Sequence, residues 1–399
     1  MAQTIIYGAS ILTLDAEDSF YYPGTVEIEG DRIARIYHGN PSDEVLSDPS
    51  ITAIDGTDKL VMPGFVDLHF HTSVAKLPLQ EYLEEVWYPS VRALTPERAY
   101  IGALHSYCTA IKSSTTTVND MYRFVGSLAE AAAKIGIRAV LSIEVALPEH
   151  KLDLLEDNKQ LYLQHNGKES DQIRVWLGHE WICTSNLELM AEVGKMKKKL
   201  VTGLHIHLCE SQQEVEDTRA KYGRAPVEIA YESGCLGLDT VAAHCVHLTD
   251  KDIGLLAKTA PQSPTTRAPT QSLETALSGC RLFKKKDASL AKPYNILRMA
   301  TKNGAKELGI DAGVIAPRKT ADLIVVFTPL LKNPPKRKMM LESHLVFGCN
   351  GSAVQHSIID GMLVMKDFKV LALDKEKLRQ DMDALFEEIS EGMKSLIVK

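Results

Sequence analysis

Two histidines one residue apart, His69 and His71, close an apolar run that begins at Val61. Side chains at positions i and i+2 of a β-strand point to the same side, so a strand here would aim both imidazoles at one point. Imidazole is a preferred ligand of zinc and of similar divalent metals. The pair therefore predicts part of a metal site, provided that further ligands converge on it.

A second group of chemically capable residues lies at positions 205–210, which read His-Ile-His-Leu-Cys-Glu. His207 and Glu210 could combine a metal ligand with a carboxylate that moves protons. His205 would share a strand face with His207, so the spacing alone leaves both histidines as candidate ligands. His244, at the end of the next predicted strand, adds a further imidazole.

The elements that must position these residues follow a regular alternation of strand-like and helix-like segments. The strand-like runs cover residues 115–121, 137–145, 173–178, 201–209 and 240–246. Repeated βα units predict a parallel sheet, and this number of units predicts an α/β fold of the (β/α)8 barrel type. In such barrels the chemistry gathers at the C-terminal ends of the strands. The histidines near such ends are His69, His71, His207 and His244.

Both ends of the chain carry short β-strand patterns instead. The predicted strands cover residues 4–14, 24–36 and 51–61 at the start, and residues 321–327, 344–347, 354–359 and 362–365 near the end. An amphipathic helix is predicted from about residue 375 to residue 397. We therefore expect residues 1–60 and 315–399 to form one small β-sandwich domain, discontinuous in sequence, and residues 61–314 to form the barrel.

Composition excludes several classes of protein. At 399 residues the chain is long enough for a large barrel with a small second domain. The net charge of −7 gives no reason to expect nucleic acid as a partner. We expect no membrane association, since no apolar stretch reaches the length of a membrane span and no leader pattern opens the chain. The seven scattered cysteines, without a Cys-x-x-Cys motif, favour reduced thiols in a cytoplasmic protein.

These motifs resemble those of the amidohydrolase superfamily, in particular the aminohydrolases that include S-adenosylhomocysteine and methylthioadenosine deaminases and triazine hydrolases. The similar stretches occur in order along the chain, at residues 62–71, 114–121, 205–210, 243–248, 297–305 and 321–326. The resemblance implies a metal-bearing (β/α)8 barrel joined to a β-sandwich made from both termini. It also implies hydrolysis of a carbon–nitrogen bond, with deamination of a purine, nucleoside or triazine as the expected reaction.

The resemblance further implies a role for each matching residue. His69, His71 and His207 would bind one divalent metal ion, with zinc expected and iron as the alternative. Glu210 would carry a proton between the attacking water and the ring nitrogen, and His244 would orient the water or polarise the reacting centre. The metal would lower the pKa of its bound water from ~16 toward neutrality, which supplies hydroxide at cellular pH.

The sequence departs from the family around the last strands of the barrel. Thr266 stands where the family carries a metal-binding aspartate, and threonine is neither a base at neutral pH nor a good zinc ligand. About 34 residues separate the helix expected to end near Lys258 from the one expected to start near Pro293. Two strands with two helices need roughly 60 residues. We therefore predict a barrel that is incomplete around its seventh strand.

Substrate-binding candidates follow from the loops at the barrel mouth. His179 lies one position away from a substrate-contacting histidine of the family, and the alternative is an ordinary loop histidine. Glu180 and Trp181 share that loop and are equally plausible pocket residues, while Trp87 follows two glutamates near the expected mouth. Packing against a helix is the alternative for both aromatic residues.

Three interpretations of the whole chain stay open at this point. The first is an active aminohydrolase with one metal ion and a small heterocyclic amine as its substrate. The second is a non-catalytic relative that keeps some metal affinity and serves as a partner subunit. The third is a splice form or gene-model product that lacks an exon. The histidines and Glu210 favour the first, and the absent aspartate favours the others. Barrels of this kind often pair, so a homo-oligomer is compatible with each.

Overall fold

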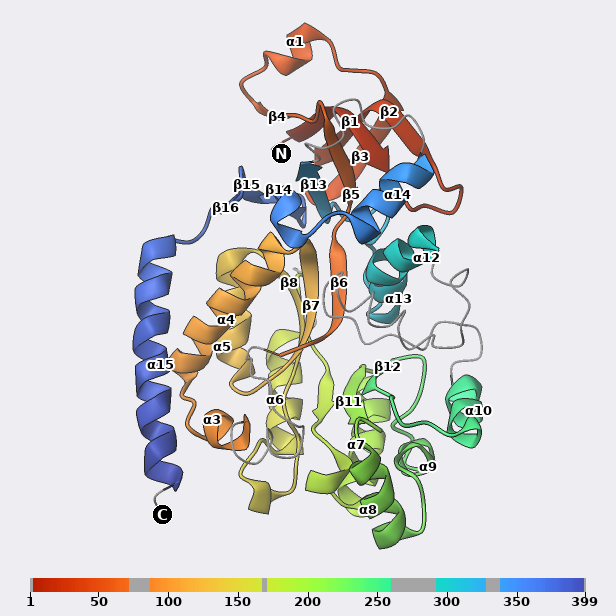
Figure 1. Cartoon of the computed structure of the whole chain (residues 1–399), viewed down its shortest axis with the longest axis vertical. Helices are drawn as coiled ribbons and strands as arrows, with labels where there is room; N and C mark the ends of the chain where they lie inside the picture. Colours follow the sequence, from red (N-terminus) through yellow and green to blue (C-terminus); the bar gives the residue numbers. More distant parts are fainter. Residues whose placement is uncertain (1–2, 72–86, 167–170, 260–291, 328–337, 398–399) are drawn as a thin grey trace.

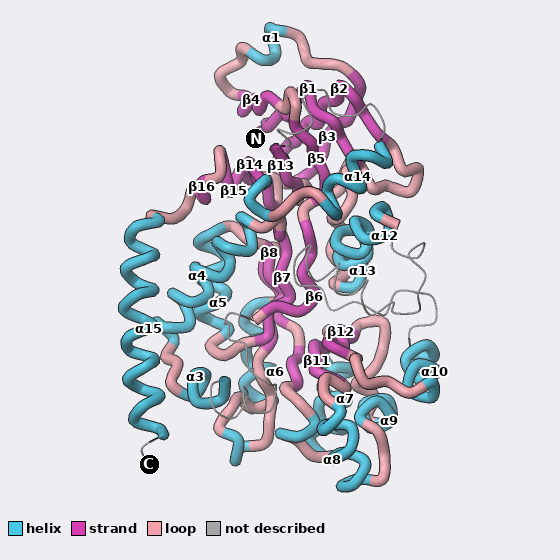
Figure 2. Tube along the Cα trace, in the orientation of Figure 1, coloured by secondary structure: helices cyan, strands magenta, loops and turns pink. Residues whose placement is uncertain are grey.

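The computed structural model describes residues 3–71, 87–166, 171–259, 292–327 and 338–397 (Figure 1). In this view a mixed sheet lies at the top, parallel strands run down the centre, and helices surround them. Figure 2 shows the same arrangement by element type, with the strands in magenta and the helices in cyan. No helix in these ranges is both long and apolar enough to cross a membrane.

One sheet combines strands from both ends of the chain. Its order is β16-β15-β14-β13-β5-β1-β2-β3, and β4 pairs with β1 beside this path. The strands are β1 (Gln3–Leu12), β2 (Phe20–Glu29), β3 (Arg32–His38), β4 (Ile51–Asp55), β5 (Lys59–Pro63), β13 (Leu323–Phe327), β14 (Val354–Ile359), β15 (Met362–Lys366) and β16 (Lys369–Val370). The antiparallel pairing of β5 with β13 connects the N-terminal strands to the C-terminal ones.

The central parallel strands form two further sheets, ordered β6-β7-β8-β9 and β10-β11-β12. Their bounds are β6 (Phe65–Phe70), β7 (Thr115–Met121), β8 (Arg138–Ser142), β9 (Ile173–Val175), β10 (Leu177–His179), β11 (Leu204–Leu208) and β12 (Thr240–His244). Among the described strands these two sheets do not close into a complete barrel. They nevertheless place the ends of β6, β11 and β12 around one site.

The predicted strand at residues 173–178 is in fact divided between the two parallel sheets. The N–H of Trp176 donates to the carbonyl of Leu141 at 2.8 Å, whereas the N–H of Leu177 donates to the carbonyl of Gly203 at 3.0 Å. The chain therefore exchanges its strand partner at Trp176. A run of six residues cannot reveal such a change, because the partners are distant in sequence.

Helices cover the outer side of the parallel strands and one face of the mixed sheet. They are α1 (Asp43–Leu46), α3 (Tyr88–Arg92), α4 (Pro96–Lys112), α5 (Val125–Ile135), α6 (Leu155–His165), α7 (Leu187–Leu200), α8 (Gln212–Tyr222), α9 (Pro226–Glu232), α10 (Asp250–Thr259), α12 (Pro293–Arg298), α13 (Gly304–Glu307), α14 (Lys338–Phe347) and α15 (Lys375–Ile397). Helix α15, predicted from residue 375 to 397, lies along α4 in Figure 1. Arg98 and Glu388 pair across these two helices at 3.0 Å.

The prediction of a strand at residues 344–347 is wrong, because these residues end helix α14. Leu341, Leu345 and Val346 are buried, and their spacing of four and five residues places them on one helical face. A window of four apolar residues contains too little periodicity to separate a strand from a buried helix.

The first strand of the parallel region is anchored directly on the mixed sheet. Only Gly64 separates β5 from β6, and a Cβ atom at this position would lie 2.1 Å from Cγ2 of Thr116. Below it, the buried guanidinium of Arg138 pairs with Asp322 at 2.8 Å and with Asp360 at 2.6 Å. These contacts fix the start of β6 and β8 relative to the sheet, and thereby the histidines at the end of β6.

Candidate metal centre and active site

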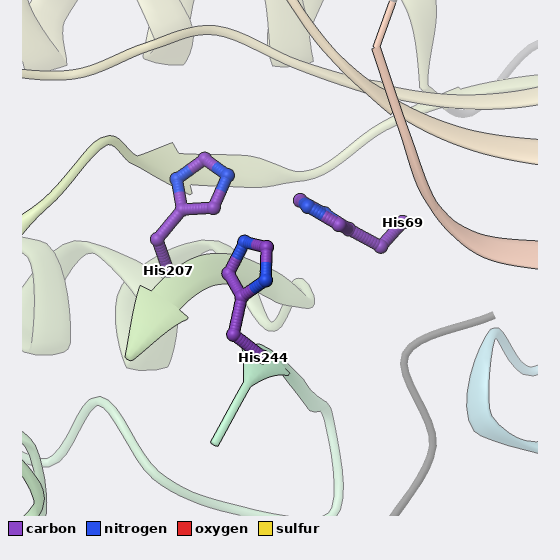
Figure 3. Close-up of side chains that lie close together, drawn as sticks. All are labelled: His69, His207 and His244. Atoms are coloured by element: carbon purple, nitrogen blue, oxygen red, sulfur yellow. The ribbon is translucent and has the colours of Figure 1, made fainter. Parts of the chain in front are cut away.

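Four imidazoles from three strands meet at the C-terminal ends of β6, β11 and β12. The ring of His69 lies 5.0 Å from that of His207 and 4.7 Å from that of His244, measured between centroids. The ring of His71 stacks on that of His207 at 5.1 Å. Figure 3 shows His69, His207 and His244 pointing toward one another from separate elements. One nitrogen of each of these three rings lies within 4.8 Å of the others, a grouping that could hold a metal ion.

The hydrogen bonds of His71 and His207 determine which nitrogen each ring presents. Nδ1 of His71 lies 2.7 Å from the carbonyl oxygen of Met121, and Nδ1 of His207 lies 2.6 Å from that of Glu180. A carbonyl only accepts, so both Nδ1 atoms carry the proton and both Nε2 atoms keep a free lone pair. Metal-binding histidines typically donate the N–H of their other ring nitrogen to a carbonyl or carboxylate in this way.

The donor geometry fits a single zinc ion. The Nε2 atoms of His71 and His207 are 3.1 Å apart. Two nitrogen ligands at about 2.05 Å from zinc are separated by about 3.3 Å when the angle between them is tetrahedral. The two lone pairs can therefore share one ion with little movement of either ring.

His205 takes a different place from His207, although both lie on one strand face. Its Nε2 is joined by a hydrogen bond to Nδ1 of His69 at 2.8 Å, and both side chains are buried. This bond leaves Nε2 of His69 available as a ligand atom. The group of three that could hold a metal consists of His69, His207 and His244, so neither His205 nor His71 belongs to it, although Nε2 of His71 lies 3.1 Å from that of His207.

Burial keeps these imidazoles neutral, which is the form that binds metal. It lowers the pKa of His71 to about 3 and that of His207 to about 4. Burial, reinforced by repulsion from the neighbouring rings, also lowers the pKa values of His69 and His244 well below the usual value. No ring of this group needs to lose a proton before it can bind a cation at neutral pH.

Glu210 lies beside the histidine group, on the loop that follows β11. Its Oε2 is 3.5 Å from Nε2 of His244. Burial, together with the neighbouring charges of Glu214 and Glu180, raises the pKa of Glu210 to about 8. A carboxyl group with a pKa near neutrality can both accept and release a proton during a reaction. The site thus combines a candidate metal centre with a candidate proton carrier.

Comparison with known proteins identifies the family of this chain. The sequence matches the amidohydrolase family over residues 60–277 and 272–364. The chain belongs to the amidohydrolase family. This match confirms the family resemblance that the sequence motifs indicated.

Two relatives cover nearly the whole of this amidohydrolase. It is 32% identical to a 5'-deoxyadenosine deaminase of Methanothermobacter thermautotrophicus, over 92% of this chain and 95% of the relative. It is 30% identical to a 5-methylthioadenosine/S-adenosylhomocysteine deaminase of Caldanaerobacter subterraneus, over 97% of this chain and 99% of the relative. The second alignment runs over 436 residues, which exceeds the 399 residues of this chain.

Solved structures share its fold. An adenosine deaminase of Xanthomonas campestris with bound zinc has a TM-score of 0.83 at 20% identity, over 97% of this chain and 98% of the other. A zinc complex of an atrazine chlorohydrolase of Arthrobacter aurescens has a TM-score of 0.81 at 18% identity, over 96% of this chain and 99% of the other. These similarities confirm the predicted α/β fold and imply that it is of the barrel type.

The predicted substrate-binding residues of the amidohydrolase lie in two places. The ring of Trp87 makes an edge contact with that of His71, with centroids 5.4 Å apart. His179, at the end of β10, is fully buried, and neither of its ring nitrogens has a hydrogen-bond partner in the described part of the chain. Burial lowers the pKa of His179 to about 3, so the ring is neutral. Trp181 directly follows Glu180 in the loop after β10 and is buried in the apolar core.

Two buried acids lie beside these residues; the sequence indicated Glu180 as a plausible pocket residue, whereas Glu144 was not singled out. Glu180 accepts a hydrogen bond from the hydroxyl of Tyr88 at 3.4 Å, and its Oε2 lies 3.6 Å from Nδ1 of His207. Glu144, which follows β8, is fully buried, and its two carboxylate oxygens have no partner among the described residues. Burial raises the pKa of Glu180 to about 7 and that of Glu144 well above its usual value. The sequence signal for both residues is their position just after a parallel strand, where barrel active sites lie.

Thr266, at the position of the absent aspartate, falls in residues 260–291, outside the described ranges. The two glutamates that precede Trp87 also lie outside them.

Proposed function

We propose that this amidohydrolase removes the exocyclic amino group of a purine-type heterocycle by hydrolysis and releases ammonia. The observation that carries this proposal is the 3.1 Å approach of the two Nε2 atoms of His71 and His207, with Glu210 beside the same group. The names of the two relatives support the substrate class, because both are deaminases of adenosine-type compounds and both align over more than nine-tenths of this chain.

His69, His71 and His207 would hold the metal ion, which we propose to be zinc. Zinc held there would supply a water of lowered pKa. Glu210 would carry one proton of that water to the ring nitrogen while the oxygen of the water bonds to the amine-bearing carbon. The second proton of the water would then pass to the amino group, so that the carbon–nitrogen bond breaks, ammonia leaves and an oxo group remains on the ring. His244, 3.5 Å from Glu210, donates or accepts a hydrogen bond that orients the water.

The proposed substrate contacts come from the buried polar groups around the histidines. His179 supports this role because both of its ring nitrogens are available for a heteroaromatic nitrogen. Trp87, in edge contact with His71, would pack against the substrate ring, and Trp181 would add an aromatic surface from the loop after β10. The uncompensated carboxylate oxygens of Glu144 and Glu180 favour a substrate rich in hydrogen-bond donors, such as the hydroxyl groups of a nucleoside.

We also propose that the barrel is incomplete around its seventh strand. The alignment that is longer than this chain supports a missing segment. The two family matches meet at residues 272–277, in the part of the sequence where the prediction places the gap. Residues 1–60 and 315–399 would form one domain and residues 61–314 the other, which the shared mixed sheet supports. A cytoplasmic location is supported by the free state of the six cysteines in the described ranges.

The test is an ammonia-release assay on zinc-loaded protein of known metal content. The panel contains adenosine, 5'-deoxyadenosine, methylthioadenosine, S-adenosylhomocysteine and a chlorotriazine. We expect ammonia from at least one purine nucleoside, and no release from the same substrates after chelation. If the zinc-loaded protein releases no ammonia from any compound of the panel, the proposal is rejected and the non-catalytic alternative is favoured.

A further inference from the structure

We propose that Glu214 is a positioning residue for Glu210, through a pair of hydrogen bonds that fix the loop between β11 and α8. The inference rests on the proposed function in one respect, namely the proton-carrying role of Glu210. Glu214 makes no hydrogen bond to the histidine group or to the carboxylate of Glu210 in the described part of the chain. Apart from its charge, which raises the pKa of Glu210, it acts on Glu210 through the backbone of the loop.

The carboxylate of Glu214 binds two successive amides of this loop. Its Oε1 accepts the N–H of Cys209 at 2.9 Å, and its Oε2 accepts the N–H of Glu210 at 2.8 Å. Burial raises the pKa of Glu214, and the hydrogen bonds from these two amides oppose that rise because they favour the ionised form. Glu214 is only 1% exposed, so water does not compete for these amides.

The loop needs such a restraint because its backbone conformation is unfavourable. Cys209 has a φ of 52°, in the left-handed region that a residue with a Cβ atom avoids. His244 and Cys245 on the facing loop share this feature, with φ values of 68° and 50°. Conformations of this kind persist only where surrounding contacts impose them, and they concentrate at functional sites.

The same peptide also connects the two loops that carry Glu210 and His244. The carbonyl of Cys209 accepts the N–H of Val246 at 3.0 Å and that of His247 at 3.1 Å. Glu214 therefore accepts the N–H of the peptide between Cys209 and Glu210, and the carbonyl of that same peptide accepts the N–H groups of the loop after His244. The 3.5 Å separation of Glu210 and His244 depends on both sets of bonds.

This arrangement differs from ordinary capping of a helix. In a capping box an acidic side chain accepts the N–H of the N-cap residue, as Glu228 does for Ala225 at 2.7 Å in helix α9. In helix α8 the hydroxyl of the N-cap residue Ser211 accepts the N–H of Glu214 at 3.1 Å. The carboxylate of Glu214 reaches beyond the N-cap to the loop, so its contacts serve the loop in addition to the helix.

The experiment compares Glu214→Gln and Glu214→Ala with Glu228→Gln as a matched control, all as zinc-loaded full chains. A glutamine keeps the shape but accepts through one atom only, so we expect kcat to fall about 10-fold in Glu214→Gln and about 100-fold in Glu214→Ala. Zinc content and KM should change less than about 3-fold. Glu228→Gln should lower the melting temperature and leave kcat unchanged.

A double-mutant cycle separates positioning from a structural role. If Glu214 acts through Glu210, the variant Glu210→Gln/Glu214→Gln should be no slower than Glu210→Gln alone, whereas independent structural damage would add. Wild-type kcat in both Glu214 variants, or additive losses in the cycle, would overturn the inference while leaving the proposed function intact. Full activity in Glu210→Gln would instead remove the proton-carrying role and the inference together.

Discussion

His71 and His207, which are 136 positions apart in the sequence, face each other through their Nε2 atoms at 3.1 Å. Each ring is oriented by a backbone carbonyl at its Nδ1 atom, from Met121 and Glu180 respectively. The backbone thus fixes the tautomer of both rings before any ligand binds, and the two lone pairs converge on one point. This pre-organisation reduces the cost of binding a cation there.

Zinc binding should depend differently on the two histidines of β11. His207→Ala removes a proposed ligand, and we expect the protein to lose its zinc. His205→Ala removes only the hydrogen-bond partner of His69, so affinity should fall about 10- to 100-fold with the stoichiometry retained. Competitive titration with a chromogenic chelator measures both. The opposite ranking would show that His205 is the ligand.

Replacement of the proposed proton carrier Glu210 should lower kcat more than it lowers zinc binding. Glu210→Gln keeps the volume of the side chain but cannot accept a proton, so kcat should fall by about 10²- to 10⁴-fold. Zinc content should stay near that of the wild type, because the three proposed ligands are unchanged. Steady-state ammonia release together with metal analysis checks both values. Equal kcat in the variant would contradict the assigned role.

The same residue predicts a pH dependence of stability in the metal-free protein. Burial raises the pKa of Glu210 to about 8 from a usual value of 4.5, so the folded state binds a proton that the unfolded state has lost between these values. The contribution of this group is present below pH 4.5 and disappears as the pH rises to about 8, with a slope of up to ~1.4 kcal/mol per pH unit.

Urea unfolding at several pH values measures this effect as the difference between wild type and Glu210→Gln. The variant should become more stable relative to the wild type as the pH rises through that range. A difference that does not vary with pH would mean that the carboxyl is ionised in the folded protein.

The junction between the mixed sheet and the parallel strands should be sensitive to a single methyl group. Gly64→Ala would place its Cβ atom 2.1 Å from Cγ2 of Thr116, so we expect a loss of about 1–3 kcal/mol in the free energy of unfolding. Gly126→Ala in helix α5 is the matched control, because a Cβ atom there meets nothing within 4 Å. The control should be neutral or stabilising by up to ~1 kcal/mol. Denaturant titration distinguishes the two, and equal effects would refute the steric explanation.

The local pattern of the sequence determined much about this protein. Alternation of side chains on a strand is enough to place His69 and His71 on one side, and the order of strand-like and helix-like segments is enough to predict a barrel-type α/β fold. The resemblance of residues 205–210 to the motif of the family singled out Glu210 as the proposed proton carrier. The first two inferences depend only on interactions between residues that are close in the chain.

Tertiary structure decided what local patterns leave open. His205 and His207 share a strand face, and only the position of His69 and of the Glu180 carbonyl gives them different partners. The division of residues 173–178 between two sheets and the burial of Glu144 likewise depend on segments distant in sequence. Hydrogen-bond partners and exposure to water are set by the packing of the whole chain, so no short stretch of sequence encodes them.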